Sequence, residues 1–407
     1  MSSDLIYSKE FDTIEMRLLI LCSVFHLSDK QKTKIEELLH NDFNWNNFYT
    51  LAVKNKIYPI IYRNLKRFDN INLDEQTIRK FEWICKENRI KALQLTKELA
   101  KLMELFRRRD IRTISVKGPL LAMALYQDPS MRVSRDLDLL VDFSDLNKAN
   151  ELLIEAGYAL DNNVRNLTRK QKEQYIKLSH HFTYSNALGT QIELHWRLSK
   201  DYYNLPFEDI WDKKKEIDIF GRNMNVLSEE ENLLYLIYHG SKHAWKRLGW
   251  LCDIYQIIKN NQLDWNCLMN RAEQLQITHM VIQSMILFRK LYGIKPHIKY
   301  DLSKKELMIA KHLAAISTLF IMNPDERAEM QGHPLFYRYN KYLWIWYRSY
   351  DRRILLIVSH FKPTIEDYKT MELQDRYYYS YYLLRFFQIM KKCKKYLVLH
   401  LKRNASL

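Results

Sequence analysis

The chain has 407 residues, which exceeds the roughly 150 residues of an average domain and is enough to bury a large core. Its 64 Lys and Arg outnumber its 48 Asp and Glu, so the net charge of +16 favours anionic partners such as nucleoside triphosphates, nucleic acid or phospholipid head groups. Only 8 Gly and 8 Pro occur, which argues against an all-β protein with many tight turns.

The cysteines and the apolar runs exclude several other classes. Neither a disulfide framework nor a zinc site is expected from the five cysteines, which are odd in number and far apart: Cys22, Cys85, Cys252, Cys267 and Cys393. The N-terminus lacks the basic segment of a signal peptide, and no apolar run approaches the ~18 residues of a membrane span. We therefore expect a cytoplasmic protein without membrane insertion.

The first part of the chain has the apolar period of helices. Over residues 1–109, apolar side chains recur at three- and four-residue spacing, as in Leu95, Leu99 and Leu102. This pattern predicts an N-terminal helical region.

Residues 110–200 carry a β pattern that the rest of the chain lacks. A β-branched run over 111–116 ends at Lys117-Gly118-Pro119, a helical stretch follows to residue 126, and residues 137–141 predict a second strand. Residues 145–157 predict a helix with Gly157 just past its C-terminus. Residues 181–185 and 190–196 predict two further strands joined by a turn. The order β-α-β-α-β-β predicts a small mixed sheet with its own helices.

From about residue 201 to 407 the helical period returns and predicts a C-terminal helical region. Its last third is rich in tyrosine, as at Tyr377 to Tyr379, Tyr381 and Tyr382, interleaved with Lys and Arg. Such interleaving can stack nucleic-acid bases, but on a helix it more commonly supplies core contacts, which is the favoured interpretation. The predicted class is α+β: a small mixed sheet over 110–200 flanked by two helical regions.

Two aspartates, Asp136 and Asp138, stand at the start of the strand predicted over 137–141. They bracket Leu137, so they point to one face of the sheet, roughly 6.6 Å apart along it. Buried unpaired carboxylates would be costly, which indicates an open, cation-binding end. Mg²⁺ suits them because it usually takes one or two carboxylates with waters and substrate phosphates, and Mn²⁺ is an alternative. Alone, the pair is equally compatible with an exposed strand start.

Residues near this pair are suited to contact phosphate. Lys117 and Gly118 lie at a strand-to-helix turn, where backbone N–H groups face an anion and glycine allows close approach. Pro119 suits the first helical position. Arg132 and Arg135 precede the aspartates and can bind phosphate oxygens in bidentate fashion, although each could instead form a salt bridge with an aspartate.

A third carboxylate, Glu193, lies on the strand predicted over 190–196. Strand alternation places Glu193 and His195 on the same face. If this strand pairs with that of Asp136 and Asp138, the three carboxylates share one face. Two-metal nucleotidyl transfer needs such an arrangement.

Several sequence blocks carry a family resemblance. They are Val116-Lys117-Gly118, Asp128-Pro129, Arg132, Asp136-Leu137-Asp138, Glu193-Leu194-His195-Trp196, and the stretch from His239 through His243 and Trp250 to Asp253. In this order they resemble the uncharacterised bacterial nucleotidyltransferases of the DNA polymerase β-type superfamily. The resemblance covers roughly residues 90 to 390.

The resemblance implies roles for four residues. Gly118 would belong to the glycine turn that contacts the triphosphate, Asp136 and Asp138 would hold the metals, and Glu193 would be the third carboxylate. Two positions depart from the family's pattern. Pro119 stands where the wider superfamily has Ser or Gly and removes an N–H donor, and Arg135 stands where this family commonly has a small residue. Phosphate binding would then depend more on Lys117 and the arginines.

Other polar residues have weaker signals. His239 and His243 stand four apart on a predicted helix, a spacing compatible with metal binding, but no Glu occupies the expected base position. A positioning or polar-packing role is therefore favoured, with Asp253 as the partner on a similar helix face. His180 and His181 are expected to be structural.

Three functions remain in competition. The leading hypothesis is a Mg²⁺-dependent nucleotidyltransferase that moves a nucleotidyl group from an NTP to an unknown acceptor in a peptide, a protein, a sugar or a small metabolite. The second is an NTP-binding or regulatory module with weak turnover, suggested by Pro119 and Arg135. The third, an RNA-tailing enzyme, is favoured by the net charge of +16 but ranks lower because no RNA-binding module is recognisable.

Overall fold

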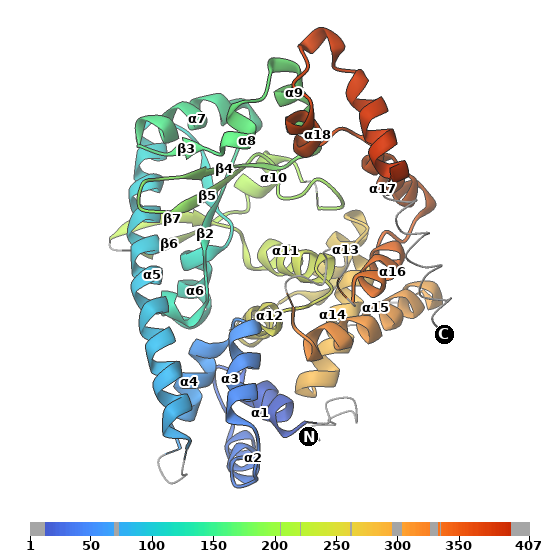
Figure 1. Ribbon diagram of the computed structural model, residues 1–407. Coiled ribbons are helices and arrows are strands. Elements are labelled where there is room, and N and C mark those ends of the chain that lie inside the picture. Colours follow the sequence, from blue (N-terminus) through green and yellow to red (C-terminus); the bar gives the residue numbers. More distant parts are fainter. Residues whose placement is uncertain are drawn as a thin grey trace.

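The computed structural model describes residues 13–68, 73–203, 205–219, 221–260, 263–294, 303–325, 333 and 335–391. Helices make up most of this part of the chain and surround one seven-stranded mixed sheet, which confirms the α+β class (Figure 1). Two large cores hold the fold together, one among the helices and one between the sheet and its covering helices.

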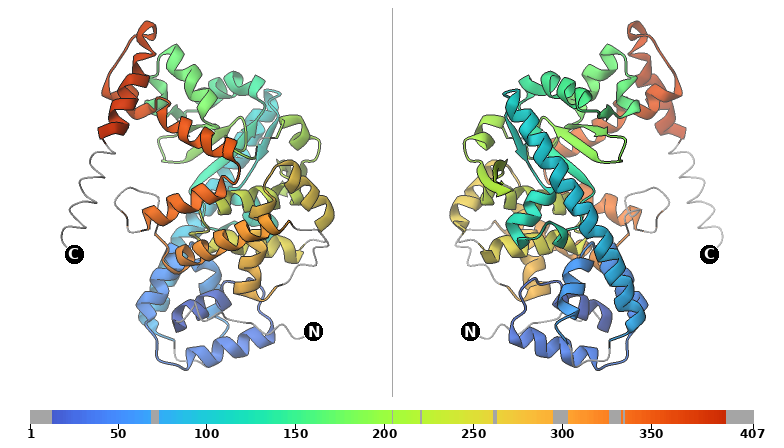
Figure 2. Two further views of the ribbon diagram at one scale, coloured as in Figure 1. Left: turned by 90° about the vertical axis from the view of Figure 1, so that its right-hand side faces the viewer. Right: turned by 90° about the vertical axis from the view of Figure 1, so that its left-hand side faces the viewer.

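The N-terminal region is helical, as predicted. Its helices are α1 (Ile14–Cys22), α2 (Asp29–Leu39), α3 (Trp45–Lys54), α4 (Tyr58–Leu65) and α5 (Glu75–Arg108). The last of these has 34 residues and is about 51 Å long. It runs from the N-terminal helices along the sheet (Figure 2). Its Phe81 packs in the helical core and its Leu99 in the sheet core, so α5 connects the two.

The sheet has the strand order β3-β4-β5-β2-β1-β7-β6. Its strands are β1 (Thr113–Ser115), β2 (Asp136–Val141), β3 (Ala159–Leu160), β4 (His181–Ser185), β5 (Gln191–His195), β6 (Lys215–Ile219) and β7 (Arg222–Val226). The pairs β2–β5 and β1–β7 are parallel, and the other neighbours are antiparallel. The intervening helices are α6 (Gly118–Tyr126), α7 (Leu146–Glu155), α8 (Asn162–Arg165) and α9 (Arg169–Leu178), with 3-10 turns at Pro129–Met131 and Phe143–Asp145. Gly157 follows α7 with a positive φ of 86°, as its predicted place after the helix requires.

The hairpin β6–β7 departs from the sequence prediction, which placed these residues in a wholly helical region. Ile217 and Met224 are register partners across the hairpin, and both pack in the sheet core. The turn between the two strands contains Gly221 with a φ of 74°, a conformation that favours glycine. Each of these strands has only five residues, and so short an alternation of apolar and polar residues is not distinctive between long helical stretches. The pairing of β7 with β1 therefore determines that the segment forms strands.

The remaining helices form the C-terminal region. They are α10 (Phe207–Trp211), α11 (Glu229–Lys242), α12 (Leu248–Asn260), α13 (Trp265–Gln274), α14 (Thr278–Tyr292), α15 (Lys304–Met322), α16 (Phe336–Trp346), α17 (Tyr350–Phe361) and α18 (Ile365–Thr370), with a 3-10 turn at Asp375–Tyr377. The end of this region packs against α9 of the sheet region, where Gln171 donates a hydrogen bond to the Tyr381 hydroxyl at 3.1 Å. Of the late tyrosines, Tyr378 and Tyr381 are buried, whereas Tyr377 and Tyr379 are exposed.

The cysteines that the structure describes, Cys22, Cys85, Cys252 and Cys267, are free thiols, and Cys393 lies outside the described residues. Among the described helices, none combines the length and the apolar character that crossing a bilayer requires.

Candidate active site

Asp138 and Glu193 are neighbours on two parallel strands. They are register partners in the pairing of β2 with β5, so strand alternation directs both side chains to the same face. His195, two residues after Glu193, lies on this face as well. Its Nε2 is 3.2 Å from Asp138 Oδ1 and 3.3 Å from Glu193 Oε2. One ligand atom from each of these three residues lies within 4.8 Å of the others.

Asp136 lies one alternation before Asp138 on β2 and lines the same cavity as Asp138 and Glu193. Burial, together with the charges of Asp138 and Glu193, raises its pKa to about 6. Asp138 behaves differently: burial opposes its ionisation, but Lys117 and His195 hold its pKa well below the usual range. The predicted convergence of three carboxylates on one cleft is therefore found in the structure.

Lys117 points into the site from the residue before α6. Its largely buried Nζ lies 4.0 Å from Asp138 Oδ1 and 3.4 Å from His239 Nδ1. It also sits over the ring of Tyr235, 4.9 Å from the centroid. Although burial favours the neutral amine, Tyr235 and Asp138 raise the lysine pKa above its ordinary value, so the ammonium is charged. Lys117 thus faces the carboxylates and lines the same cavity.

Gly118 begins α6 in the left-handed region, with a φ of 72°. A side chain there would be strained by the backbone conformation, while its Cβ would meet the Asp136 carbonyl oxygen at an ordinary 3.5 Å. Pro119 lies in the first turn of the helix, as predicted. The turn thereby fixes Lys117 beside the first residue of β2.

Arg132 and Asp253 form a buried ion pair, with Nε 2.9 Å from Oδ2. Asp253 also accepts a hydrogen bond from the Tyr126 hydroxyl at 2.9 Å, and Arg132 donates to the Ser134 hydroxyl at 3.2 Å. Arg132 therefore forms a salt bridge with an aspartate, which is the predicted alternative to a phosphate contact. This ion pair holds the loop before β2 against α12.

The prediction that His243 and Asp253 lie on a similar face of one helix is wrong. The two residues do not share a helix, because α11 ends at Lys242 and the positive φ angles of Ala244 (51°) and Trp245 (56°) separate it from α12. The physical reason lies in Trp245, whose ring fills the space against α11 where a Cβ on Gly240 would stand. Helical periodicity alone did not reveal this break.

His239 and His243 lie near the site, as expected. His239 lines the cavity beside Lys117, and burial together with the Lys117 charge lowers its pKa well below the ordinary value. Its ring meets Trp250 edge-on at 5.1 Å, and the His243 ring lies 5.0 Å from that of His239. Both histidines are therefore packed on the side of the sheet that carries the carboxylates.

The cavity over the carboxylates has a volume of about 210 Å³. Lys56 and Ile57 of the N-terminal region form one wall, and Arg247 and Trp250 of the C-terminal region form another. This confirms the expectation that helical regions on both sides wall the cleft. Arg135, which precedes Asp136 in the chain, lines the cavity as well.

Sequence reasoning missed the place of His180 and His181. His181 is the register partner of His195 on the antiparallel strand β4, and its Nε2 lies 3.8 Å from Glu193 Oε1. The predicted hairpin already contained both strands, but its turn was expected to end at Gly189 and its second strand to begin at Thr190. In the structure β5 begins at Gln191 and Thr190 belongs to the loop. This shift of one residue in the register places His181 opposite His195.

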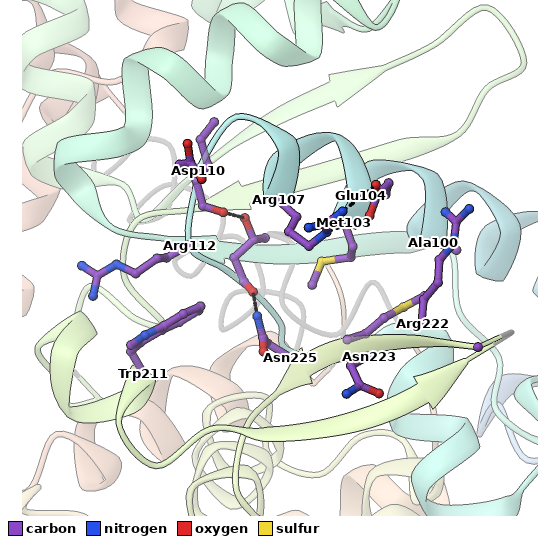
Figure 3. A pocket seen from close by; sticks show the side chains of 14 residues that line it. Ala100, Met103, Glu104, Arg107, Asp110, Arg112, Trp211, Arg222, Asn223 and Asn225 are labelled. Atoms are coloured by element: carbon purple, nitrogen blue, oxygen red, sulfur yellow. Dashed lines mark hydrogen bonds and ion pairs between the residues drawn. The ribbon is translucent and has the colours of Figure 1, made fainter.

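A second cavity, of about 650 Å³, lies at the other end of β1 (Figure 3). Arg112 and Trp211 line it, and Asn225 donates a hydrogen bond across it to the Thr113 carbonyl oxygen at 3.1 Å. Although this cavity is larger, it contains none of the carboxylates of β2 and β5. We therefore assign the candidate active site to the smaller cavity.

Two comparisons relate the chain to known proteins. The profile of a family described as uncharacterised nucleotidyltransferases matches residues 41–293, a range that contains Lys117, the three carboxylates and Asp253. Among solved structures, the chain is similar to an antigenic nucleotidyltransferase-like protein from Paracoccidioides brasiliensis, with 18% identity, a TM-score of 0.34, and coverage of 51% of this chain and 94% of that chain. No curated protein matches the chain. Because the family profile matches more than half of the sequence, the chain belongs to the family of uncharacterised nucleotidyltransferases.

Proposed function

We propose that this protein transfers a nucleotidyl group from an NTP to an acceptor, with Mg²⁺ held by Asp136, Asp138 and Glu193. The observation that carries the proposal is the register of β2 with β5, which places Asp138 beside Glu193 and next to a cavity lined by Lys117. The acceptor class, in a peptide, a protein, a sugar or a small metabolite, is left open by these residues.

The residues of the site fit a divalent cation. Carboxylate oxygens are the ligands that Mg²⁺ prefers, and Mn²⁺ accepts them as well. The raised pKa of Asp136, about 6, reflects burial and repulsion from Asp138 and Glu193, and a bound cation would offset that repulsion. When bound there, the metal would neutralise charge on the triphosphate and favour ionisation of the attacking oxygen.

The other charged residues of the cavity are suited to hold the triphosphate. Lys117 supplies an ammonium at the turn before α6, and Lys56, Arg135 and Arg247 add positive charge to the walls. The volume of about 210 Å³ is below the roughly 300–1,000 Å³ of a typical small-molecule site, so it suits the phosphates better than a whole nucleotide. The base would then lie toward the opening.

His195 and Arg132 are proposed as positioning residues. His195 is buried, and its Nε2 donates toward Asp138 and Glu193, so it fixes the orientation of two carboxylates. Arg132 holds the loop before β2 through Asp253 and so positions Asp136 at the start of the strand. Neither residue needs to touch the substrate to affect the reaction.

A transfer assay tests the proposal. The purified protein is incubated with Mg²⁺ and each NTP labelled at the α-phosphate, together with peptide, protein, sugar and RNA acceptors, and covalent label is measured. The Asp138→Asn variant should lose transfer, while Asp212→Asn, which removes an exposed aspartate after α10, should retain it. Equal transfer by both variants would contradict the carboxylate assignment.

The alternative function is NTP binding without turnover. Pro119 favours it, because proline in the first turn of α6 removes one backbone N–H that could bind phosphate. Calorimetric titration with Mg-ATP and Mg-GTP separates the two functions. Saturable binding without label transfer to any acceptor would favour a regulatory module.

A further inference from the structure

Three histidines lie together where β4 meets β5. The ring centroids of His180 and His181 are 4.5 Å apart, and that of His195 lies 5.5 Å from the first and 5.0 Å from the second. One ring nitrogen from each lies within 4.8 Å of the others. The cluster borders the carboxylate site through His195 but extends away from it, toward the start of β4.

Each of the three rings has one nitrogen without a hydrogen-bond partner. The Nδ1 atoms of His180, His181 and His195 are all buried and lack a hydrogen-bond partner. Buried polar atoms in folded proteins are rarely left this way, so three in one cluster require an explanation. A metal ion that accepts a lone pair from one nitrogen of each ring would provide a partner for the cluster.

The Nε2 atoms of His181 and His195 lie near carboxylates, as the second ring nitrogen does in many metal-binding histidines. In such sites the second ring nitrogen commonly donates to a carboxylate, which sets the tautomer and the ring orientation. His195 Nε2 has this relationship with Asp138 and Glu193, and His181 Nε2 lies 3.8 Å from Glu193 Oε1. Each of these two histidines therefore presents a lone pair on Nδ1 when Nε2 carries the proton.

Metal binding requires neutral imidazoles, and the charged groups around the cluster have both signs. Lys200 and Lys242 act on His180, whereas Asp138 and Glu193 lie beside His195. Lys242 is itself paired with Asp201, at 3.3 Å, so part of its repulsion for a cation is compensated.

We propose that His180, His181 and His195 bind a transition-metal ion at a site separate from the carboxylate site for Mg²⁺. Zn²⁺ is the ion chosen for the experiment below. Imidazole nitrogens favour Zn²⁺ and related ions, whereas Mg²⁺ favours oxygen. Around a tetrahedral ion with bonds of about 2.0 Å the nitrogens stand about 3.3 Å apart, so ring nitrogens that now lie within 4.8 Å of one another would move closer on binding. The ion would join β4 to β5 and hold the His195 ring against the two carboxylates.

The experiment measures Zn²⁺ binding directly and does not depend on NTP turnover. The full chain is stripped with a chelator, and Zn²⁺ is titrated by calorimetry in the presence of excess Mg²⁺. His180→Ala and His181→Ala should each weaken Zn²⁺ binding by at least about 100-fold, since even outer-shell changes cost 10–100-fold. The matched control is His312→Ala, which removes an exposed histidine on α15 and should leave binding unchanged.

A second measurement covers the case in which a variant fails to fold. X-ray absorption at the zinc edge of the loaded wild-type protein should show imidazole nitrogens in the first shell. Absence of Zn²⁺ binding by the stripped wild-type protein, binding that both alanine variants retain, or a first shell without imidazole would each overturn the proposal. Zn²⁺ binding by a wild-type protein that shows no transfer contradicts the proposed function alone, and transfer without Zn²⁺ binding contradicts this proposal alone, so the two fail separately.

Discussion

Arg132 donates from Nε to Oδ2 of Asp253 across 2.9 Å, and both side chains are buried between the loop before β2 and α12. Removing one partner leaves the other charge buried and unpaired. We expect Asp253→Ala to lower the free energy of unfolding by about 3–5 kcal/mol, as for other broken buried pairs. Urea unfolding followed by circular dichroism measures this. Glu155→Ala breaks the exposed pair with Arg109 and should cost less than about 1 kcal/mol; a similar loss in both variants would contradict the prediction.

Asp138 and Lys117 should differ in their kinetic effects. Asp138→Asn removes a proposed metal ligand, so we expect transfer to fall by at least about 1,000-fold, or about 4 kcal/mol in the barrier. Lys117→Met removes a proposed phosphate contact worth about 1.5–3 kcal/mol, so KM for the NTP should rise about tenfold or more with a smaller change in kcat. Steady-state kinetics with labelled NTP separate the two patterns. An unchanged KM in Lys117→Met would remove the lysine from phosphate binding.

Gly118 should be sensitive to substitution because of its backbone. Its φ of 72° makes Gly118→Ala unfavourable by about 1–2 kcal/mol, although space for the Cβ exists. We expect relief of this strain to move Lys117 and to reduce transfer as well as the melting temperature. Gly157→Ala is the control, because Gly157 has a φ of 86°, an open surrounding and no contact with the site. Equal loss of transfer in both variants would indicate a general stability effect.

His279 should make the fold sensitive to acid. Its ring is buried in α14, with Nε2 3.1 Å from the Trp346 carbonyl oxygen, and burial lowers its pKa from 6.5 to about 4. Between these values the unfolded chain binds more protons than the folded one, so stability falls as the pH drops through this window. His279→Gln keeps an N–H donor but does not titrate. Between pH 7 and 4.5 the variant should lose about 2 to 3 kcal/mol less than the wild type.

Urea unfolding at the two pH values provides this comparison. His312→Gln, which replaces an exposed histidine, controls for the removal of one imidazole. An acid sensitivity of His279→Gln equal to that of the wild type would contradict the assignment.

Local patterns in the sequence predicted the local parts of this site. Alternation around Leu137 and Ile192 was enough to place Asp138 and Glu193 on one face, because a strand has a fixed period of two. The partners of Arg132 and His181 were not predictable in the same way. Arg132 meets Asp253 from a helix more than a hundred residues later, and His181 meets His195 through a register that one loop residue decides. Tertiary pairing, which periodicity does not encode, determines both contacts.

The pairing of β1 with β7 has a consequence for the newly made chain. Ser115 and Val226 are register partners, so β1, an inner strand of the sheet, pairs with a neighbour that is synthesised about 110 residues later. At about 5–20 residues per second, translation leaves one edge of β1 open for roughly 6 to 20 seconds. Open edges recruit foreign strands and promote aggregation. The length of β1, only 3 residues, limits this hazard, because such a short edge offers few hydrogen bonds to a wrong partner on the ribosome.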